Sequence, residues 1–286
     1  MKKIISGKVR EVYESENCEL VIVTTDRLSA FDVILPTPIV GKGVALNKIS
    51  NFWFDFTKDI VKNHIISTNI CDMPEEFKKE RTFYVNRTIK VKKLKMLPYE
   101  FVIRGYMFGS MWEAYKQNKG FCGYTFQEGY QKAEKLKQPI MTPSIKMEQG
   151  HDVYISIEQL KEELGEEMAN RIYEVSMQLY KTCYEYAYEK GIIIADTKFE
   201  FGVDETGELV LGDEIFTPDS SRFWDKKDYC VGVSPRSSDK QFVRDWLIEN
   251  DLNGKTLEQP LPQEIVEETE KLYNECCKCI TGKEIY

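Results

Sequence analysis

Apolar residues recur with helical spacing in the second half of the chain. One stripe, with spacings of three and four residues, predicts a long helix that ends at Gly191; it consists of Met168, Ile172, Val175, Leu179, Cys183 and Tyr186. A similar pattern predicts a last helix over residues 262–280. Two capping boxes, Ser156 with Gln159 and Ser238 with Gln241, predict two further helix starts.

The first half of the chain has the pattern of a β-rich region. Apolar runs predict strands over 19–25, 83–96 and 100–104, after a hairpin near the amino end. A helix is predicted over 106–117, whereas 120–150 lacks a clear period and is expected to be mostly loop. Further strands are predicted over 192–195 and on both sides of a turn at 204–207. Strands early and helices late predict an α+β fold with two lobes, 1–105 and 106–286.

Composition and charge narrow the class of protein. The chain has 286 residues, 42% of them apolar, and a formal net charge of −8, which disfavours a general nucleic-acid binder. No run approaches the length of a membrane span, and the amino terminus lacks the apolar stretch of a signal peptide, so we expect a cytoplasmic protein without a membrane partner. The eight cysteines are then expected to be reduced, and the cluster Cys276, Cys277 and Cys279 is expected to pack in the last helix rather than bind a metal.

The segment ADTKFEFG, residues 195–202, is the most informative stretch. As a strand it puts Asp196, Lys198 and Glu200 on one face. A four-residue turn would pair Val203 with Glu208, set Glu200 opposite Leu211 and make Asp213 its diagonal neighbour. Two neighbouring carboxylates suit Mg²⁺, which keeps phosphate oxygens or water as its other ligands. A solvated strand face with ordinary Lys–Glu pairs is the alternative.

Basic residues beside small polar ones form a second group of candidates. Arg104 precedes Ser110 at the start of the predicted helix, and Arg222 follows Ser220 and Ser221. Lys240 and Arg244 lie one turn apart on another predicted helix. Together these residues predict a phosphate pocket, because guanidinium groups match phosphate oxygens. Singly, each is better interpreted as a surface ion pair or a cap.

Four polar segments carry weaker signals. Gly7, Lys8 and Arg10 suggest a loop over nucleotide phosphates, although the spacing of a Walker A loop is absent. Residues 25–32 and 41–43 fit turn and cap chemistry, and so does His151 with Asp152.

The ordered set of these segments resembles the SAICAR synthetase family (phosphoribosylaminoimidazole-succinocarboxamide synthase). The matching stretches are SGKVREVY (6–13), TDRLSAFD (25–32), RGYMFGSMWEAY (104–115), PIMTPSIKMEQGHD (139–152), ADTKFEFG (195–202), GDEIFTPDSSRFW (212–224) and DKQFVRDWL (239–247). They run collinearly over nearly the whole chain. Ile145 departs from the threonine expected there, while its neighbours Ser144 and Lys146 fit.

The resemblance implies an ATP-dependent ligase of purine biosynthesis. It would condense 5-amino-1-(5-phosphoribosyl)imidazole-4-carboxylate, the ribotide CAIR, with L-aspartate to give SAICAR, ADP and phosphate. The implied fold has a kinase-like antiparallel amino-terminal sheet lobe and a larger mixed carboxy-terminal lobe, with ATP in the cleft between them.

The resemblance also implies roles for individual residues. Gly7, Lys8 and Arg10 would cover the ATP phosphates, residues 93–98 would be the hinge that reads adenine, and Glu200 with Asp213 would bind Mg²⁺. The ribotide would contact Arg104, Ser110, Asp196, Lys198 and Arg222, with Lys240 and Arg244 near its 5′-phosphate; Asp196 and Lys198 are the expected catalytic pair. Lys146, on the ATP side, and the His151–Asp152 loop, on the substrate side, would cap the site. Residues 26–32 are only a candidate for holding aspartate, and no oligomeric state is predicted.

Two other classes remain as alternatives. A kinase-like phosphotransferase acting on an alcohol would need an HRD-x4-N catalytic loop and a DFG motif, and the sequence has neither. A non-catalytic nucleotide-binding protein would have no need for Lys198, Glu200 and Asp213 together, and it would show no turnover.

Overall fold

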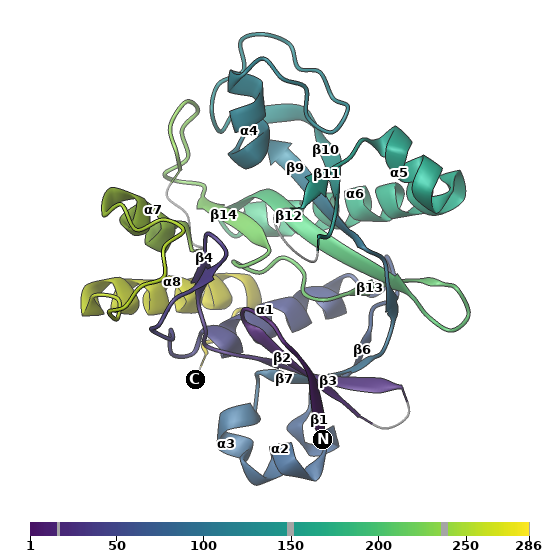
Figure 1. Ribbon diagram of the computed structural model, residues 1–286, viewed down its shortest axis with the longest axis vertical. Helices are drawn as coiled ribbons and strands as arrows, with labels where there is room; N and C mark the ends of the chain where they lie inside the picture. Colours follow the sequence, from purple (N-terminus) through teal and green to yellow (C-terminus); the bar gives the residue numbers. More distant parts are fainter. Residues whose placement is uncertain (16–17, 148–151, 236–239, 286) are drawn as a thin grey trace.

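The computed structural model describes residues 1–15, 18–147, 152–235 and 240–285. An antiparallel sheet of five strands occupies the amino-terminal part, in the order β1 (Lys2–Ser6), β2 (Arg10–Glu14), β3 (Glu19–Thr24), β7 (Thr88–Lys92) and β6 (Ile65–Ser67). One face of it is covered by η1 (Ile70–Asp72), α2 (Glu75–Lys79) and α3 (Arg81–Tyr84), visible at the lower end of Figure 1. Val21 and Val23 pack there against Met73 and Phe77.

A second sheet forms the centre of the molecule. Its main path runs β11 (Val153–Tyr154), β10 (Lys135–Ile145), β9 (Tyr99–Tyr106), β12 (Ile192–Val203) and β13 (Leu209–Gly212). The short strands β8 (Lys95–Met96) and β14 (Ser221–Asp225) also pair with β12, which therefore has neighbours along its whole length. α4 (Gly109–Lys116) follows β9, and α5 (Ile157–Leu164) with α6 (Glu166–Glu189) packs against the sheet. Asp196 and Thr197 are paired on both sides, by β9 and β14.

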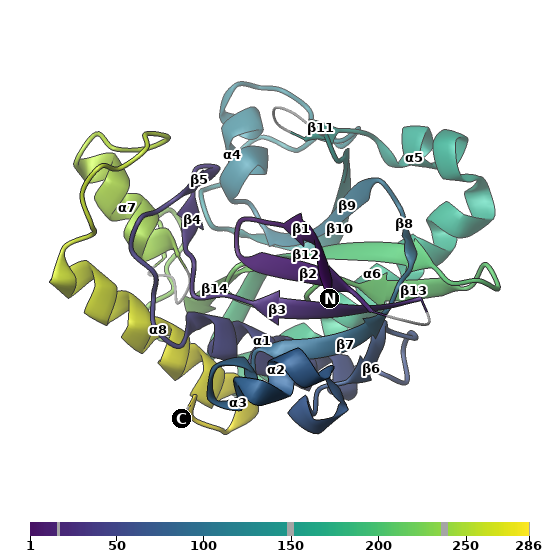
Figure 2. The same cartoon turned by 60° about the horizontal axis from the view of Figure 1, so that its bottom comes forward.

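The remaining helices join the two parts of the chain. α1 (Lys42–Phe56) packs against β3 of the first sheet and against α8 (Gln263–Thr281), and α7 (Gln241–Glu249) contacts α8. Figure 2 shows α7 and α8 on one side of the molecule and α5 on the opposite side. Between β3 and α1 lies a small hairpin of β4 (Ser29–Ala30) and β5 (Val33–Ile34).

Several predicted elements are confirmed. The helical stripe corresponds to α6, whose buried face includes Ile172, Val175 and Leu179, and α8 carries Cys276 and Cys277 in its buried face. Ser156 caps α5 by accepting a hydrogen bond from Gln159 N at 3.1 Å. The strands at 19–25 and 100–104 correspond to β3 and β9. The capping box at Ser238 lies outside the described residues.

Three predictions about elements need correction. Most of the described residues of 120–150 are loop, as expected, but Lys135–Ile145 form β10, a strand of eleven residues that was not predicted. Residues 83–96 are not one strand, because α3 ends in this region and β7 and β8 are separate. The helix predicted over 106–117 begins only at Gly109, since β9 continues to Tyr106.

The α+β class is confirmed, and in the described strands every pairing between named elements is antiparallel. The chain leaves the first sheet at Lys92 and enters the second at Lys95. Residue 105 as a lobe boundary stays a prediction. In the described part of the chain, no helix is long and apolar enough to cross a membrane.

Candidate active site

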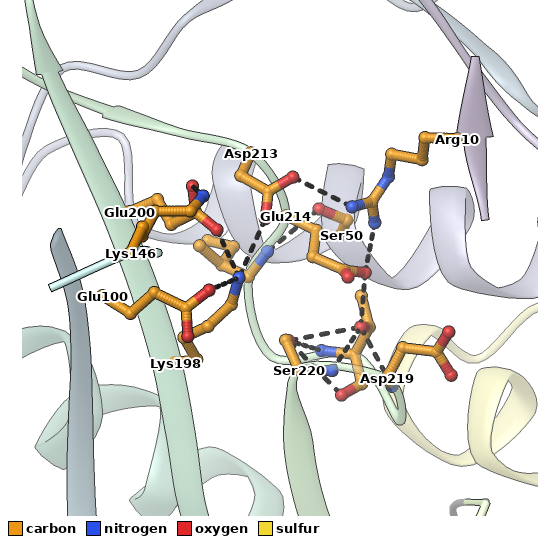
Figure 3. A network of polar contacts seen from close by, with 12 residues as sticks. Arg10, Ser50, Glu100, Lys146, Lys198, Glu200, Asp213, Glu214, Asp219 and Ser220 are labelled. Carbon is orange, nitrogen blue, oxygen red and sulfur yellow. Dashed lines mark hydrogen bonds and ion pairs between the residues drawn. The ribbon is translucent and has the colours of Figure 1, made fainter. Parts of the chain in front are cut away.

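Lys198 lies among three carboxylates, as Figure 3 shows. Its Nζ forms an ion pair with Glu200 and lies 3.1 Å from Glu100 Oε1 and 3.4 Å from Asp213 Oδ2. Lys146 Nζ reaches the other oxygen of Glu200 at 2.6 Å. The predicted face of β12 is therefore confirmed: Lys198 and Glu200 point the same way and meet Asp213.

The predicted register between β12 and β13, from which we expected Asp213 to lie near Glu200, is wrong by one residue. Glu200 pairs with Gly212 rather than Leu211, and Val203 pairs with Leu209 rather than Glu208. The physical cause is the turn, where Asp204 Oδ1 accepts hydrogen bonds from the main-chain N–H groups of Thr206 and Glu208 and so lengthens the loop. By strand alternation Asp213 would then face away from Glu200. It has a left-handed backbone instead, with φ of 54°, and its carboxylate reaches Lys198.

Arg10 brings the amino-terminal sheet to this group. Its guanidinium lies 2.9 Å from Asp213 Oδ1 and also pairs with Glu214. We call the four carboxylates Glu100, Glu200, Asp213 and Glu214, with Lys146, Lys198 and Arg10, the acidic centre.

The predicted phosphate loop is the connection between β1 and β2. Gly7 N donates to Arg10 O at 2.8 Å, and Arg27 donates to the carbonyls of Gly7 and Lys8 at 2.8 and 3.1 Å. Lys8 itself is exposed and pairs with Asp32, so it stands apart from the acidic centre. Arg27 was not singled out in the sequence, and it holds this loop in shape.

Burial and neighbouring charges shift the pKa values of the two predicted metal ligands in opposite directions. Burial and the charge of Asp213 raise the pKa of Glu200 against the opposing effect of Lys198 and Lys146. Burial acts to raise the pKa of Asp213 too, but Arg10 and Lys198 outweigh it and hold that pKa well below its usual range. For Lys198, burial is outweighed by Glu200 and Asp213, which raise its pKa.

The donor set of this pair fits Mg²⁺. Mg²⁺ is usually bound by one or two carboxylates together with substrate phosphates, rather than by a cage made only of protein ligands. Glu200 and Asp213 provide such a pair. Among the residues that the structure describes, no group of three or more Asp, Glu, His or Cys side chains is arranged to hold a metal ion.

Asp196 lies between two arginines on the same strand face. Its Oδ2 pairs with Arg222 and lies 3.7 Å from Arg104 Nη1; β9 and β14 bring the arginines in, because Asp196 is opposite both in register. Burial lowers the pKa of Arg104, and Asp196 opposes that shift. We call Asp196, Arg104 and Arg222 the Asp196 cluster.

Polar groups from three other elements surround the Asp196 cluster. Arg104 donates to Thr142 Oγ1 at 2.9 Å and to Ser110 Oγ at 3.2 Å, and Ser110 Oγ lies 2.9 Å from the Tyr154 hydroxyl. A Cβ at Gly109, which has a φ of 61°, would lie 2.9 Å from Arg222 Nη2. Glycine is therefore required for the close approach of Arg222 to the start of α4.

A third group, the Asp219 cluster, joins α1, α7 and α8. Lys42 is fully buried, and its Nζ lies 2.8 Å from Asp219 Oδ2, while Tyr273 donates to Asp219 Oδ1 at 2.7 Å. Lys240 and Arg244 lie at the start of α7, where burial lowers the pKa of Lys240 and the charge of Asp219 opposes it. The cluster consists of Asp219, Lys42, Lys240 and Arg244, so it has an excess of positive charge.

One further candidate lies beside the acidic centre, and some participants were missed. Asp152 accepts a hydrogen bond at 3.1 Å from the main-chain N of Met147, the residue after Lys146, and His151 lies outside the described residues. Glu100, Glu214, Thr142, Tyr154 and Lys42 were not predicted as site residues; Lys42 was interpreted as turn chemistry. The alternation Glu100, Val102, Arg104 on one strand was a usable signal for Glu100, because it matches the acidic face of β12. Asp26 accepts a hydrogen bond from Gly43 N at 2.8 Å at the start of α1, and residues 26–32 stay a candidate for holding aspartate.

Comparisons with known proteins agree with the resemblance found in the sequence. The family model described as SAICAR synthetase matches residues 3–261. A phosphoribosylaminoimidazole-succinocarboxamide synthase from Lachnospira eligens is 50% identical, over 98% of this chain and 95% of that protein. A structure of the SAICAR synthase from Saccharomyces cerevisiae complexed with SAICAR superposes with a TM-score of 0.90, at 42% identity, over 99% of this chain and 95% of that one. A SAICAR synthetase in complex with ADP superposes with a TM-score of 0.70, at 25% identity, over 98% of each chain. The chain belongs to the SAICAR synthetase family.

Proposed function

We propose that the three clusters together carry out the ATP-dependent condensation of CAIR with L-aspartate, the reaction of a purine-biosynthesis ligase of the SAICAR synthetase family. The observation that carries this assignment is the acidic centre, in which residues 10, 100, 146, 198, 200 and 213 meet from distant parts of the chain. These residues meet within an α+β fold that has two main antiparallel sheets. We further propose that ATP binds in a kinase-like cleft between two lobes and that residues 93–98 form the hinge of this cleft.

ATP binding is assigned to the loop between β1 and β2 and to the acidic centre. Gly7, Lys8 and Arg10 would cover the phosphates, and Lys146 would contact them beside Glu200. Glu200 and Asp213 would hold Mg²⁺, which when bound supplies charge neutralisation on the transferring phosphoryl group. The ADP complex of a relative supports nucleotide use in this family.

Ribotide binding is assigned to the Asp196 cluster with Ser110. Arg104 and Arg222 offer guanidinium groups suited to an anionic ligand, and Asp196 fixes their orientation. Lys240 and Arg244 of the Asp219 cluster would lie toward the 5′-phosphate, and Asp152 would help to close the site. The yeast relative's complex with SAICAR supports a ligand of this chemistry in the family.

The reaction has to activate a carboxylate, which is a poor electrophile. Transfer of the γ-phosphoryl group of ATP to the CAIR carboxylate would form an acyl phosphate and ADP. The neutral amine of aspartate then attacks the acyl carbon. The C–N bond forms, the C–O bond to the phosphoryl group breaks, and phosphate leaves, taking up the proton that the nitrogen loses. Lys198 and Arg10 neutralise charge on the transferring group, and Asp196 orients the ribotide through its arginines.

The assay measures ADP release with CAIR, aspartate or Mg²⁺ omitted in turn. The proposal expects full turnover only when all are present. With CAIR labelled by ¹⁸O in its carboxylate, one label should appear in the released phosphate. Unlabelled phosphate contradicts the acyl phosphate route, and ADP release without CAIR contradicts the ligase assignment.

The proposed location of the protein is the cytoplasm, with its reducing conditions.

A further inference from the structure

Arg27 binds the loop between β1 and β2 through all three nitrogens of its guanidinium. Nη2 donates to the carbonyl of Gly7 at 2.8 Å, and Nε donates to the carbonyl of Lys8 at 3.1 Å. Nη1 donates to Oε1 of the buried Glu11 at 2.5 Å. Because a guanidinium is planar and presents its donors in a fixed geometry, it holds the three acceptors at fixed positions.

The next carbonyl of the loop is also engaged by the segment that carries Arg27. Val9 O accepts from the main-chain N of Thr25 and from Thr25 Oγ1, both at 2.8 Å. Thr25 Oγ1 accepts in turn from Arg27 N at 3.3 Å. Three successive carbonyls, those of residues 7 to 9, are therefore bound by residues 25 and 27.

The bound carbonyls determine where the N–H groups of the loop point. In a trans peptide the C=O of one residue and the N–H of the next lie in one plane and point in opposite directions. The described part of the chain contains no cis peptide bond. The N–H groups of Lys8 and Val9 therefore point away from the guanidinium of Arg27. Among the described residues, neither of these N–H groups has a hydrogen-bond acceptor.

Successive N–H groups without protein acceptors form an anion-binding concavity. We propose that Arg27 is a positioning residue for the nucleotide, which turns the N–H groups of Lys8 and Val9 toward the ATP phosphates by binding the carbonyls of Gly7 and Lys8. The proposal rests on the proposed function, in which this loop covers those phosphates. Arg27 itself makes no contact with a substrate in this proposal, so its loss acts on ATP and not on aspartate or CAIR.

Two variants separate the carbonyl contacts of Arg27 from its ion pair. Arg27→Met removes both, whereas Arg27→Lys keeps a cation for Glu11 but loses the planar group that reaches both carbonyls. A hydrogen bond to a charged group contributes at least about a factor of ten in an equilibrium constant. We therefore expect KM for ATP to rise about tenfold in both variants, with KM for CAIR and for aspartate within about twofold.

Adenosine, which has no phosphates, reports whether the rest of the nucleotide site is intact. Its inhibition constant against ATP should stay within about twofold in both Arg27 variants, because the loop N–H groups act only on phosphates. The matched control is Lys3→Met. Lys3 is the other cation paired with Glu11, at 3.0 Å, so its loss should leave KM for ATP unchanged.

A measurement on the wild-type protein covers the case in which the Arg27 variants do not fold. The Val9 amide signal in the ¹H–¹⁵N spectrum is assigned through Val9→Ile. ATP with Mg²⁺ should shift this signal, and adenosine should not.

Five results would each overturn the proposal. They are an unchanged KM for ATP in Arg27→Met, a wild-type KM for ATP in Arg27→Lys, equal losses for ATP and adenosine, a selective loss for aspartate, and a Val9 signal that ATP does not shift. Failure of the proposed function would look different, because the wild-type protein itself would then form no ADP with ATP, CAIR and aspartate present.

Discussion

The pairing of Arg222 with Asp196 gives the most selective test of the ribotide site. Arg222 is the better arginine to change, because its side chain is 27% exposed and therefore reachable by a ligand. The Arg104 side chain is only 4% exposed and also binds Thr142 and Ser110, so its loss would mix binding with folding. Arg222→Gln keeps a hydrogen-bonding side chain while removing the charge.

The expected loss follows from the burial of the pair. Removing one partner of a buried, hydrogen-bonded charge pair costs about 2–5 kcal/mol. Because Arg222 keeps contact with solvent, we take the lower end, about 2 kcal/mol. With about 1.4 kcal/mol for each factor of ten, KM for CAIR should rise roughly 30-fold.

The KM values of the Arg222→Gln variant are measured by steady-state kinetics, with each substrate varied in turn. KM for ATP should change by less than about twofold, because a loss of ground-state contacts affects only the ligand that made them. Arg171→Gln, the same substitution on the exposed face of α6, is the matched control and should leave all three KM values unchanged. Equal losses for CAIR and ATP would indicate a general structural defect, and a selective loss for aspartate would move that substrate to the Asp196 cluster. Either result refutes the assignment.

Three further predictions concern the acidic centre and the Asp219 cluster. Asp213→Asn should lower turnover at limiting Mg²⁺ by about 10- to 100-fold, and wild-type turnover in a Mg²⁺ titration would contradict its role as a ligand. Because Arg10 and Lys198 hold the pKa of Asp213 low, its charge stabilises the folded state, so the melting temperature of the variant should also fall. Lys42→Met leaves Asp219 buried without its main cation, and such a change costs about 3–5 kcal/mol of folding free energy. At about 2–4 °C per kcal/mol, calorimetry should show a melting temperature about 6–20 °C lower. Lys58→Met, at an exposed ion pair, is the control and should show little change. Burial acts to raise the pKa of Asp219, but Lys42 and Lys240 outweigh burial and hold that pKa below its ordinary value of 3.8. The Asp219 carboxylate therefore stabilises the fold above that pH, and this stabilisation is lost as the pH falls through the folded-state pKa. The stability difference between wild type and Asp219→Asn, measured by urea unfolding, should then be constant from about pH 8 to 5 and shrink below about pH 4, and a difference that grows on acidification would contradict this sign.

How much of the fold the sequence predicts depends on how each element is buried. α6 has one buried face and a polar opposite face, and Gly191 follows its end, so its period is readable. α1 lies between β3 and α8 and buries residues around most of its surface, including Lys42 and Asn47, so it lacks that contrast. β10 contains Pro139 and Pro143, which normally mark a loop or an edge, yet it pairs with both β9 and β11.

The site shows the same division between local and long-range determinants. The acid–lysine–acid face of β12 follows from alternation alone and was predictable. The position of Asp213 depends on a hydrogen-bonded turn at Asp204 and on a left-handed residue, neither of which alternation describes. Lys42 was hidden for another reason: its partner Asp219 is far away in the sequence, and no local pattern reports that α1 and α8 enclose them both.

The distribution of charge explains how a chain of net charge −8 can bind anionic ligands. In the acidic centre, four carboxylates face three cationic side chains, so a divalent cation would be favoured there. The Asp196 cluster has two arginines for one carboxylate, and the Asp219 cluster has three cationic side chains for one carboxylate, so each favours an anion. In each of these two clusters, a buried carboxylate pairs with the cationic side chains. It fixes their geometry and reduces the repulsion between them before a ligand binds. The net charge of the whole protein therefore disfavours an extended polyanion but is compatible with a nucleotide or a ribotide, because a small ligand responds to the few charges within a Debye length of about 8–10 Å.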